Sequence, residues 1–301
     1  MNIYKDGFVL ILVLVIVGLL AIGVVNYNYW VRTKAVSASN QLFDLKTLYL
    51  AKAGINYSLF LLQNDEEELS DNLNENWAEI EPFNLGEGKI TVEIIDENGK
   101  ININNLLSKD GKIDTTYEGI LKRLFALLEL EKNLLPPICD WLDADGTPLP
   151  DGAEEDYYAN LISPYSCKND SLDTIGELIM VKGIDEEILY DQGKGLVNFL
   201  TVTSDNKVNI NTASVEVLEA ILDDSTLAEK VISRRETEPF AKGEISKFLS
   251  GTEASKKANL FTYKSNFFSL RARGEIPPHY QKGIKAVVQR NPLKILYYKI
   301  E

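Results

Sequence analysis

Residue types on which many enzymes and nucleic-acid-binding proteins depend are scarce in this chain of 301 residues. Its one histidine, His279, leaves little material for a histidine-rich metal site or a Ser-His-Asp triad. Basic residues are also in deficit: 31 lysines and arginines face 45 acidic residues, for a formal net charge of −14. This balance repels a phosphate backbone, so we expect no nucleic-acid partner, whereas acidic clusters suit the binding of cations.

Cysteine is limited to two residues, Cys139 and Cys167. They would be able to pair if this part of the chain lies in an oxidising compartment. They flank an acidic stretch, so a disulfide between them would brace it. Two buried free thiols are the alternative.

Charge is absent from residues 8–31, between Asp6 and Arg32. As a helix these 24 residues cover about 36 Å, enough to cross a bilayer core of about 30 Å. A secretory signal would be followed by small residues at a cleavage site, but residues 26–30 contain no Ala-x-Ala pattern. The run alone therefore predicts an uncleaved membrane helix that carries a polar domain on one side.

Apolar residues continue at helical spacing from residue 32 to residue 63, which predicts one long helix over residues 8–62. Its second half is amphipathic, as expected of a helix that packs on a domain. The acidic residues 65–71 that follow are interpreted as a solvated helix end.

Strands are indicated on both sides of a helical region. Residues 88–96 alternate apolar and polar side chains, and Glu97-Asn-Gly resembles a hairpin turn. Residues 267–274, 284–290 and 293–300 predict an antiparallel meander, with Phe268, Leu270 and Ala272 facing inward. Residues 106–200 between these regions are mostly helical in pattern.

Two hexapeptides are nearly the same: Lys100-Ile-Asn-Ile-Asn-Asn and Lys207-Val-Asn-Ile-Asn-Thr. Each follows a turn and precedes a helix. This similarity predicts neighbouring positions in one sheet, although two copies do not make a repeat array.

The stretch from Cys139 to Tyr158 contains seven carboxylates and no lysine or arginine. Such a group is either solvated or bridged by a cation, and the aromatic residues Trp141, Tyr157 and Tyr158 argue against simple solvation, because aromatic side chains usually help to bury a loop. Asp143 and Asp145 stand two apart before Gly146, as in loops that bind calcium through oxygen atoms. The match to an EF-hand is partial. Acid–base catalysis by a carboxylate pair is a weaker alternative.

Gly7-Phe8, at the near edge of the apolar run, resembles the processing site of type IV prepilins and type II secretion pseudopilins. Those families usually carry a glutamate at the fifth mature position, which is Leu12 here. Further motifs follow in order: Asp140-Trp-Leu-Asp-Ala-Asp, Gly152-Ala-Glu-Glu-Asp-Tyr-Tyr, residues 172–183, and Val208-Asn-Ile-Asn-Thr-Ala. Together with Leu12, they resemble the type II secretion system protein K family, minor pseudopilins that lack this glutamate.

The resemblance implies an α+β fold in which a long pilin-like helix packs on a small antiparallel sheet, with a large all-α domain inserted between strands. We expect a prepilin leader over residues 1–7 and an N-terminal helix over 8–62, with 8–31 transmembrane. The pseudopilin core would comprise residues 63–105 and 201–301, and the inserted domain residues 106–200.

The resemblance also implies a non-enzymatic protein of the inner membrane, with one span and a periplasmic soluble domain. It would cap or initiate the pseudopilus tip together with other minor pseudopilins, after cleavage by a prepilin peptidase. It implies calcium near the acidic loop, with these candidate ligands: Asp140, Asp143, Asp145, Glu154, Glu155 and Asp156.

An alternative comes from residues 208–218, which also resemble the start of the helix-hairpin-helix domain of membrane-anchored DNA receptors. Such hairpins bind phosphate through backbone amides at Gly-x-Gly. Here the hairpin begins with Asp223 and Asp224, and Arg234 with Arg235 make no basic face. We therefore expect the shape without DNA binding.

Overall fold

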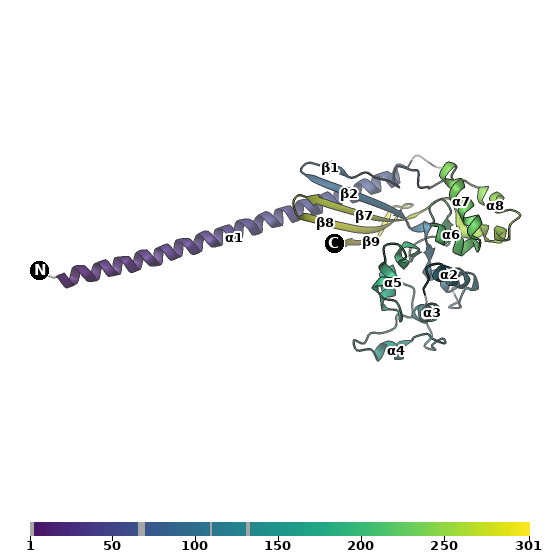
Figure 1. Ribbon diagram of the computed structural model, residues 1–301, viewed down its shortest axis with the longest axis horizontal. Helices are drawn as coiled ribbons and strands as arrows, with labels where there is room; N and C mark the ends of the chain where they lie inside the picture. The colour runs from purple at the N-terminus through teal and green to yellow at the C-terminus, as the bar shows by residue number, and fades with distance from the viewer. Residues whose placement is uncertain (1–2, 66–69, 109, 131–132) are drawn as a thin grey trace.

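The structure, a computed structural model, describes residues 3–65, 70–108, 110–130 and 133–301. Its first element, α1 (Ile3–Gln63), is one helix of 61 residues, which makes it about 90 Å long. Figure 1 shows its N-terminal half projecting away from the rest of the molecule. The apolar side chains of this half are exposed, and the helix is long and apolar enough to cross a membrane. The expected long N-terminal helix is confirmed.

The C-terminal half of α1 packs on β2 (Gly88–Asp96), β7 (Phe267–Ile276) and β8 (Tyr280–Gln289). Helix and sheet come very close at two glycines. A Cβ atom placed on Gly54 would lie 2.8 Å from the Cβ of Ala272, and one on Gly274 would lie 2.3 Å from the carbonyl oxygen of Thr47. Side chains at these positions would force the helix away from the sheet.

The sheet has the strand order β1-β2-β7-β8-β9, and every pair is antiparallel. Its edges are β1 (Phe83–Leu85) and β9 (Lys294–Ile300). Phe268, Leu270 and Ala272 are buried on the face that meets α1, as alternation predicted. The C-terminal meander is confirmed, whereas β1 is too short to show a sequence pattern.

Between β2 and β7 the chain forms a mostly helical part beyond one end of the sheet (Figure 1). Its α-helices are α2 (Thr115–Leu127), α3 (Leu135–Leu142), α4 (Glu155–Ala159), α5 (Glu186–Tyr190), α6 (Val215–Leu222), α7 (Ser225–Thr237) and α8 (Glu244–Phe248). Its short 3₁₀ helices are η1 (Glu97–Gly99), η2 (Ile103–Leu106), η3 (Ile175–Met180), η4 (Leu196–Asn198) and η5 (Glu253–Leu260). A helical domain inserted between the strands of a pilin-like sheet confirms the predicted α+β fold.

The hairpin expected after β2 is not formed. Asp96 accepts a hydrogen bond from the backbone N–H of Asn98 at 2.8 Å, and this cap holds the Asn-Gly pair in η1. The chain then continues as β3 (Ile101–Asn102) into the inserted part. The prediction of a hairpin was wrong because the buried Asp96 competes for the turn's backbone.

The prediction that the two similar hexapeptides lie side by side in one sheet was wrong. β3 pairs in parallel with β4 (Leu200–Thr201), and β5 (Val208–Asn209) pairs in parallel with β6 (Phe261–Thr262). The hexapeptides thus belong to two separate two-stranded sheets.

Their local structures are nevertheless alike. The side chains of Asn102 and Asn209 each accept a hydrogen bond from the backbone N–H two residues later, at 3.0 Å in both. Asn104 exchanges two hydrogen bonds with the backbone of Leu172, and Asn211 does the same with Phe240. The repeated sequence therefore encodes one strand-and-turn unit twice, each copy attached to a different later segment.

The buried apolar residues that the structure describes form two cores. One joins α1 to the sheet, and the other contains the buried apolar residues from Ile101 to Phe261. The second core includes α6, because this helix packs on α2 and not on the sheet. The helical part therefore takes in residues 208–261, which the sequence had grouped with the sheet.

Candidate functional site

The acidic loop connects α3 with α4. α3 starts with prolines near its first position, where the N–H that proline lacks would be unpaired in any case. Its C-cap is Asp143, whose N–H donates to the carbonyl of Cys139 at 2.9 Å. The loop then turns at two aspartates: Asp143 accepts from the N–H of Asp145 at 3.1 Å, and Asp145 from that of Thr147 at 2.7 Å.

Three of the six predicted calcium ligands converge in this loop. Asp140, Asp143 and Glu154 each place one carboxylate oxygen within 4.8 Å of the other two. Asp140 is fully buried and Glu154 is 4% exposed. Among the described residues, neither oxygen of Glu154 has a hydrogen-bond partner, although an unpaired buried charge is strongly destabilising. These oxygens match the ligand preference of a hard cation.

The loop closes tightly over Asp140. This carboxylate accepts from the N–H of Leu149 at 3.2 Å and from that of Ala153 at 2.7 Å. A Cβ atom on Gly152 would lie 1.9 Å from Oδ2 of Asp140. Glycine at this position therefore lets the backbone reach the carboxylate.

The electrostatics of the three acids also favour a cation. Burial, opposed by backbone hydrogen bonds, raises the pKa of Asp140 and that of Asp143. Burial, together with the charges of Asp143 and Asp140, raises the pKa of Glu154 to about 7. A divalent cation bound among these oxygens would remove the repulsion and lower all three pKa values.

The other three predicted ligands lie outside this group. Asp145 is used in the turn with Thr147. Glu155 accepts from the backbone N–H of Cys167 at 2.8 Å, and Asp156 is exposed in the first turn of α4. Spacing alone did not separate the three converging carboxylates from these three.

The expected disulfide is not formed, since Cys139 and Cys167 are both buried and free. The Cys167 thiol donates to the carbonyl oxygen of Asp140 at 3.6 Å. Burial raises the pKa of Cys139 to about 12 and that of Cys167 to about 11. Both sulfurs are therefore protonated and unreactive at neutral pH.

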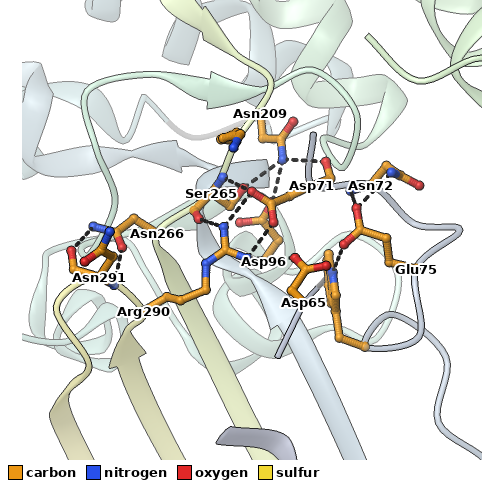
Figure 2. A network of polar contacts seen from close by, with 12 residues as sticks. Asp65, Asp71, Asn72, Glu75, Asp96, Asn209, Ser265, Asn266, Arg290 and Asn291 are labelled. Atoms are coloured by element: carbon orange, nitrogen blue, oxygen red, sulfur yellow. Dashed lines mark hydrogen bonds and ion pairs between the residues drawn. The ribbon is translucent and has the colours of Figure 1, made fainter. Parts of the chain in front are cut away.

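A second acidic group, Asp65, Asp71 and Glu75, lies at the end of α1 (Figure 2). The sequence indicated a solvated acidic end over residues 65–71, of which 66–69 lie outside the described residues. Asp71 is only 2% exposed, so for this residue the prediction was wrong. Its charge is balanced by Arg290, more than two hundred positions away in the sequence.

Arg290 supplies the positive charge for two of the three acids in this group. Its guanidinium contacts both oxygens of Asp71, at 2.7 and 2.8 Å, and Asp65 at 3.0 Å. Glu75 accepts from the N–H of Asn72 at 2.7 Å and from the indole N–H of Trp77 at 2.7 Å. These partners make the group a structural junction.

Asp96 lies beside Asp71 in the same junction (Figure 2). Its carboxylate accepts hydrogen bonds from the side chains of Asn209, Thr212 and Ser265, at 3.1, 2.5 and 2.5 Å. Burial raises the pKa of Asp96 to about 6, against these hydrogen bonds. The network ties the sheet to β5 of the inserted part, so it lies between the two apolar cores.

Gly7, Phe8 and Leu12 lie in α1, in the part that projects from the molecule. Leu12 is 48% exposed and Phe8 67% exposed. The helix runs unbroken through the predicted processing site.

Comparisons with known proteins agree with these features. Two family models match, both described as type II secretion system protein K, over residues 99–194 and 208–261. A relative from Pseudomonas aeruginosa named type II secretion system protein K is 29% identical, over 86% of this chain and 80% of its own. One from Klebsiella pneumoniae with the same name is 27% identical, over 70% of this chain and 68% of its own.

Among solved structures, the crystal structure of the GspK-GspI-GspJ complex from enterotoxigenic Escherichia coli contains a chain of the same fold. The TM-score is 0.68 at 20% sequence identity, with 90% of this chain and 99% of that chain covered. The two family-model matches lie in the inserted part, and the fold match extends to the sheet and its helix. The chain therefore belongs to the type II secretion system protein K family.

Proposed function

We propose that this protein is a minor pseudopilin that caps or initiates the tip of a type II secretion pseudopilus. The proposal is carried by the fold match, which covers 90% of the chain. In this fold an exposed apolar helix and an inserted helical domain belong to the same molecule. Before assembly, residues 8–31 hold the chain in the inner membrane as a single span, with the soluble part in the periplasm. A prepilin peptidase removes residues 1–7.

The tip position is supported by two features. Leu12 replaces the glutamate that would pair with the amino terminus of a neighbouring subunit, so no partner above this chain is needed. The inserted part also widens the molecule beyond the end of its sheet (Figure 1). A subunit of this shape ends a filament more readily than it continues one.

We propose calcium as the cation of the acidic loop, held by Asp140, Asp143 and Glu154. Calcium binds six to eight oxygen atoms, so backbone carbonyls and water would complete its coordination. The ion would cancel the buried charge of Glu154 and fix the connection between α3 and α4. Its role here is structural, in keeping with a family of assembly proteins and not of enzymes.

The DNA-receptor alternative is weakened by the use of both arginines inside the protein. Arg235 donates to the carbonyls of Ile210 and Ala213, at 2.8 and 2.6 Å. Arg234 pairs with Glu244 at 3.0 Å and lies over the ring of Phe240. Neither guanidinium is therefore available to a phosphate.

Co-purification of the full chain with its cognate counterparts of GspI and GspJ, from membranes dissolved in detergent, tests the proposal. We expect one complex that contains all three chains. A salt-sensitive shift of DNA by the same preparation, without such a complex, would favour the alternative.

A further inference from the structure

The sheet face that points away from α1 carries a row of cations. The strand register places Arg271 of β7 beside Lys285 of β8, and Lys285 beside Lys299 of β9. Glu93 of β2 lies on the other side of Arg271. Because Ala272, next along β7, is buried under α1, these alternate side chains face outward.

The cationic side chains of this row are only partly paired with acidic residues of the same chain. Arg271 pairs with Glu93 at 3.1 Å, and Lys299 approaches Glu301 at 3.9 Å. Lys285 forms no ion pair with any residue that the structure describes. Its partial burial and the charge of Arg271 lower its pKa, against the opposing effect of the nearby Glu97 and Glu301. Like charges directly opposite one another on neighbouring strands are destabilising.

An apolar row borders these cations. Val287 of β8 and Tyr297 of β9 are paired in register, and both are partly exposed. β9, which carries Tyr297, is an edge strand of the sheet. Apolar side chains beside charged ones are typical of a protein interface with an apolar centre and a polar rim.

We propose that Arg271, Lys285, Tyr297 and Lys299, together called the basic face, bind an acidic surface of a neighbouring pseudopilin. The proposal rests on the proposed function and adds the surface and the chemistry of the partner. A chain of net charge −14 repels acidic partners over most of its surface. At the basic face a partner's carboxylates would instead neutralise the crowded cations, which directs the approach and the orientation of the partner.

The test measures the affinity of the detergent-solubilised full chain for its counterparts of GspI and GspJ, between about 50 and about 300 mM NaCl. Wild-type affinity should fall as salt rises. The double variant Lys285→Glu/Lys299→Glu should bind at least about tenfold more weakly, with little salt dependence. Lys285→Arg/Lys299→Arg should retain wild-type affinity.

A matched control is Lys230→Glu/Lys256→Glu, which makes the same change of net charge at exposed positions of the inserted part. It should stay within about twofold of the wild type, as expected for charges outside the interface. Thermal unfolding of the Lys285→Glu/Lys299→Glu variant at the wild-type temperature would show that folding is intact.

Equal affinities for the two charge-reversed variants would overturn the basic face while leaving the proposed function in place. A wild-type chain that binds neither counterpart would contradict the proposed function, and the basic face with it. Unchanged partner affinity combined with lost binding to vesicles of anionic phospholipid would assign the face to a membrane surface, which also overturns the proposal.

Discussion

Arg290 holds Asp71 in a two-point ion pair, with Nη1–Oδ1 and Nη2–Oδ2 distances of 2.7 and 2.8 Å. Asp71 follows the long helix α1 and Arg290 follows β8, so the pair links the segment after α1 to the end of this strand. Arg290 also donates to the carbonyl of Ser265 at 2.6 Å, just before β7. Through Ser265, Arg290 also connects the sheet to the end of the inserted part.

Replacing Arg290 by methionine should destabilise the soluble part by about 3–5 kcal/mol, because Asp71 would be left buried without its partner. Arg290→Lys keeps the charge but loses the two-point geometry, so its cost should be smaller. Arg273→Met, on an exposed side chain, serves as the control. Chemical unfolding in detergent solution measures the difference, and equal midpoints for Arg290→Met and the wild type would refute this role.

The junction should make stability fall as the pH rises. Burial raises the pKa of Glu75 to about 8 and that of Asp96 to about 6. Both values exceed the usual carboxyl range, so the folded state binds these protons more tightly than the unfolded state does. The stabilisation is complete below about pH 4 and is lost progressively toward pH 8.

Unfolding midpoints measured from pH 5 to pH 9 test this direction. Glu75→Gln should flatten the decline, while Glu79→Gln, at an exposed position, should reproduce the wild-type curve. The slope is the quantity to compare, since the glutamine also changes the hydrogen bond with Trp77. A Glu75→Gln slope equal to that of the wild type would assign the pH dependence elsewhere.

Calcium should stabilise the inserted part and bind more tightly as the pH rises through about 7, where Glu154 loses its proton. At a calcium concentration about a hundredfold above the dissociation constant, the gain is about 2.7 kcal/mol. Glu154→Gln should abolish most of it, and Asp156→Asn should not. Calorimetry with and without a chelator measures the unfolding temperature of each variant. If calcium does not change the unfolding temperature of the wild type, the proposed calcium site is wrong.

Processing by a prepilin peptidase should yield a chain that begins at Phe8. Gly7→Leu should block this cleavage, whereas Gly18→Leu should be cleaved normally, because an added Cβ at Gly18 would have no described tertiary contact within 4 Å. Mass spectrometry of the membrane-extracted protein distinguishes the products. An intact wild-type chain in the presence of the peptidase would contradict the predicted site.

Much of the fold was predictable from local patterns. The apolar run, the alternation around Leu270 and the helical spacing in α2 depend on neighbouring residues, and all of these elements are confirmed. The turn after Asp96 was not predictable, because its shape depends on hydrogen bonds from Thr212 and Ser265. These partners are distant in sequence and meet only in the folded chain.

For the same reason, the sequence predicted the location of the candidate site but not which of its acids converge. Composition pointed to the acidic loop, but only folding selects Asp140, Asp143 and Glu154 from six similar acids. The junction was missed because the acidic residues near Asp71 resemble any solvated helix end. An arginine at the end of a predicted strand, as Arg290 is, was the one available signal, and it did not indicate its partner.

The position of this chain along isolated pseudopili tests the central proposal most directly. Gold-labelled antibody against the inserted part should mark one end of each filament and leave the shaft unlabelled. Label spread along the shaft would contradict the tip assignment, because a subunit with Leu12 and a bulky insertion would then be shown to continue the filament.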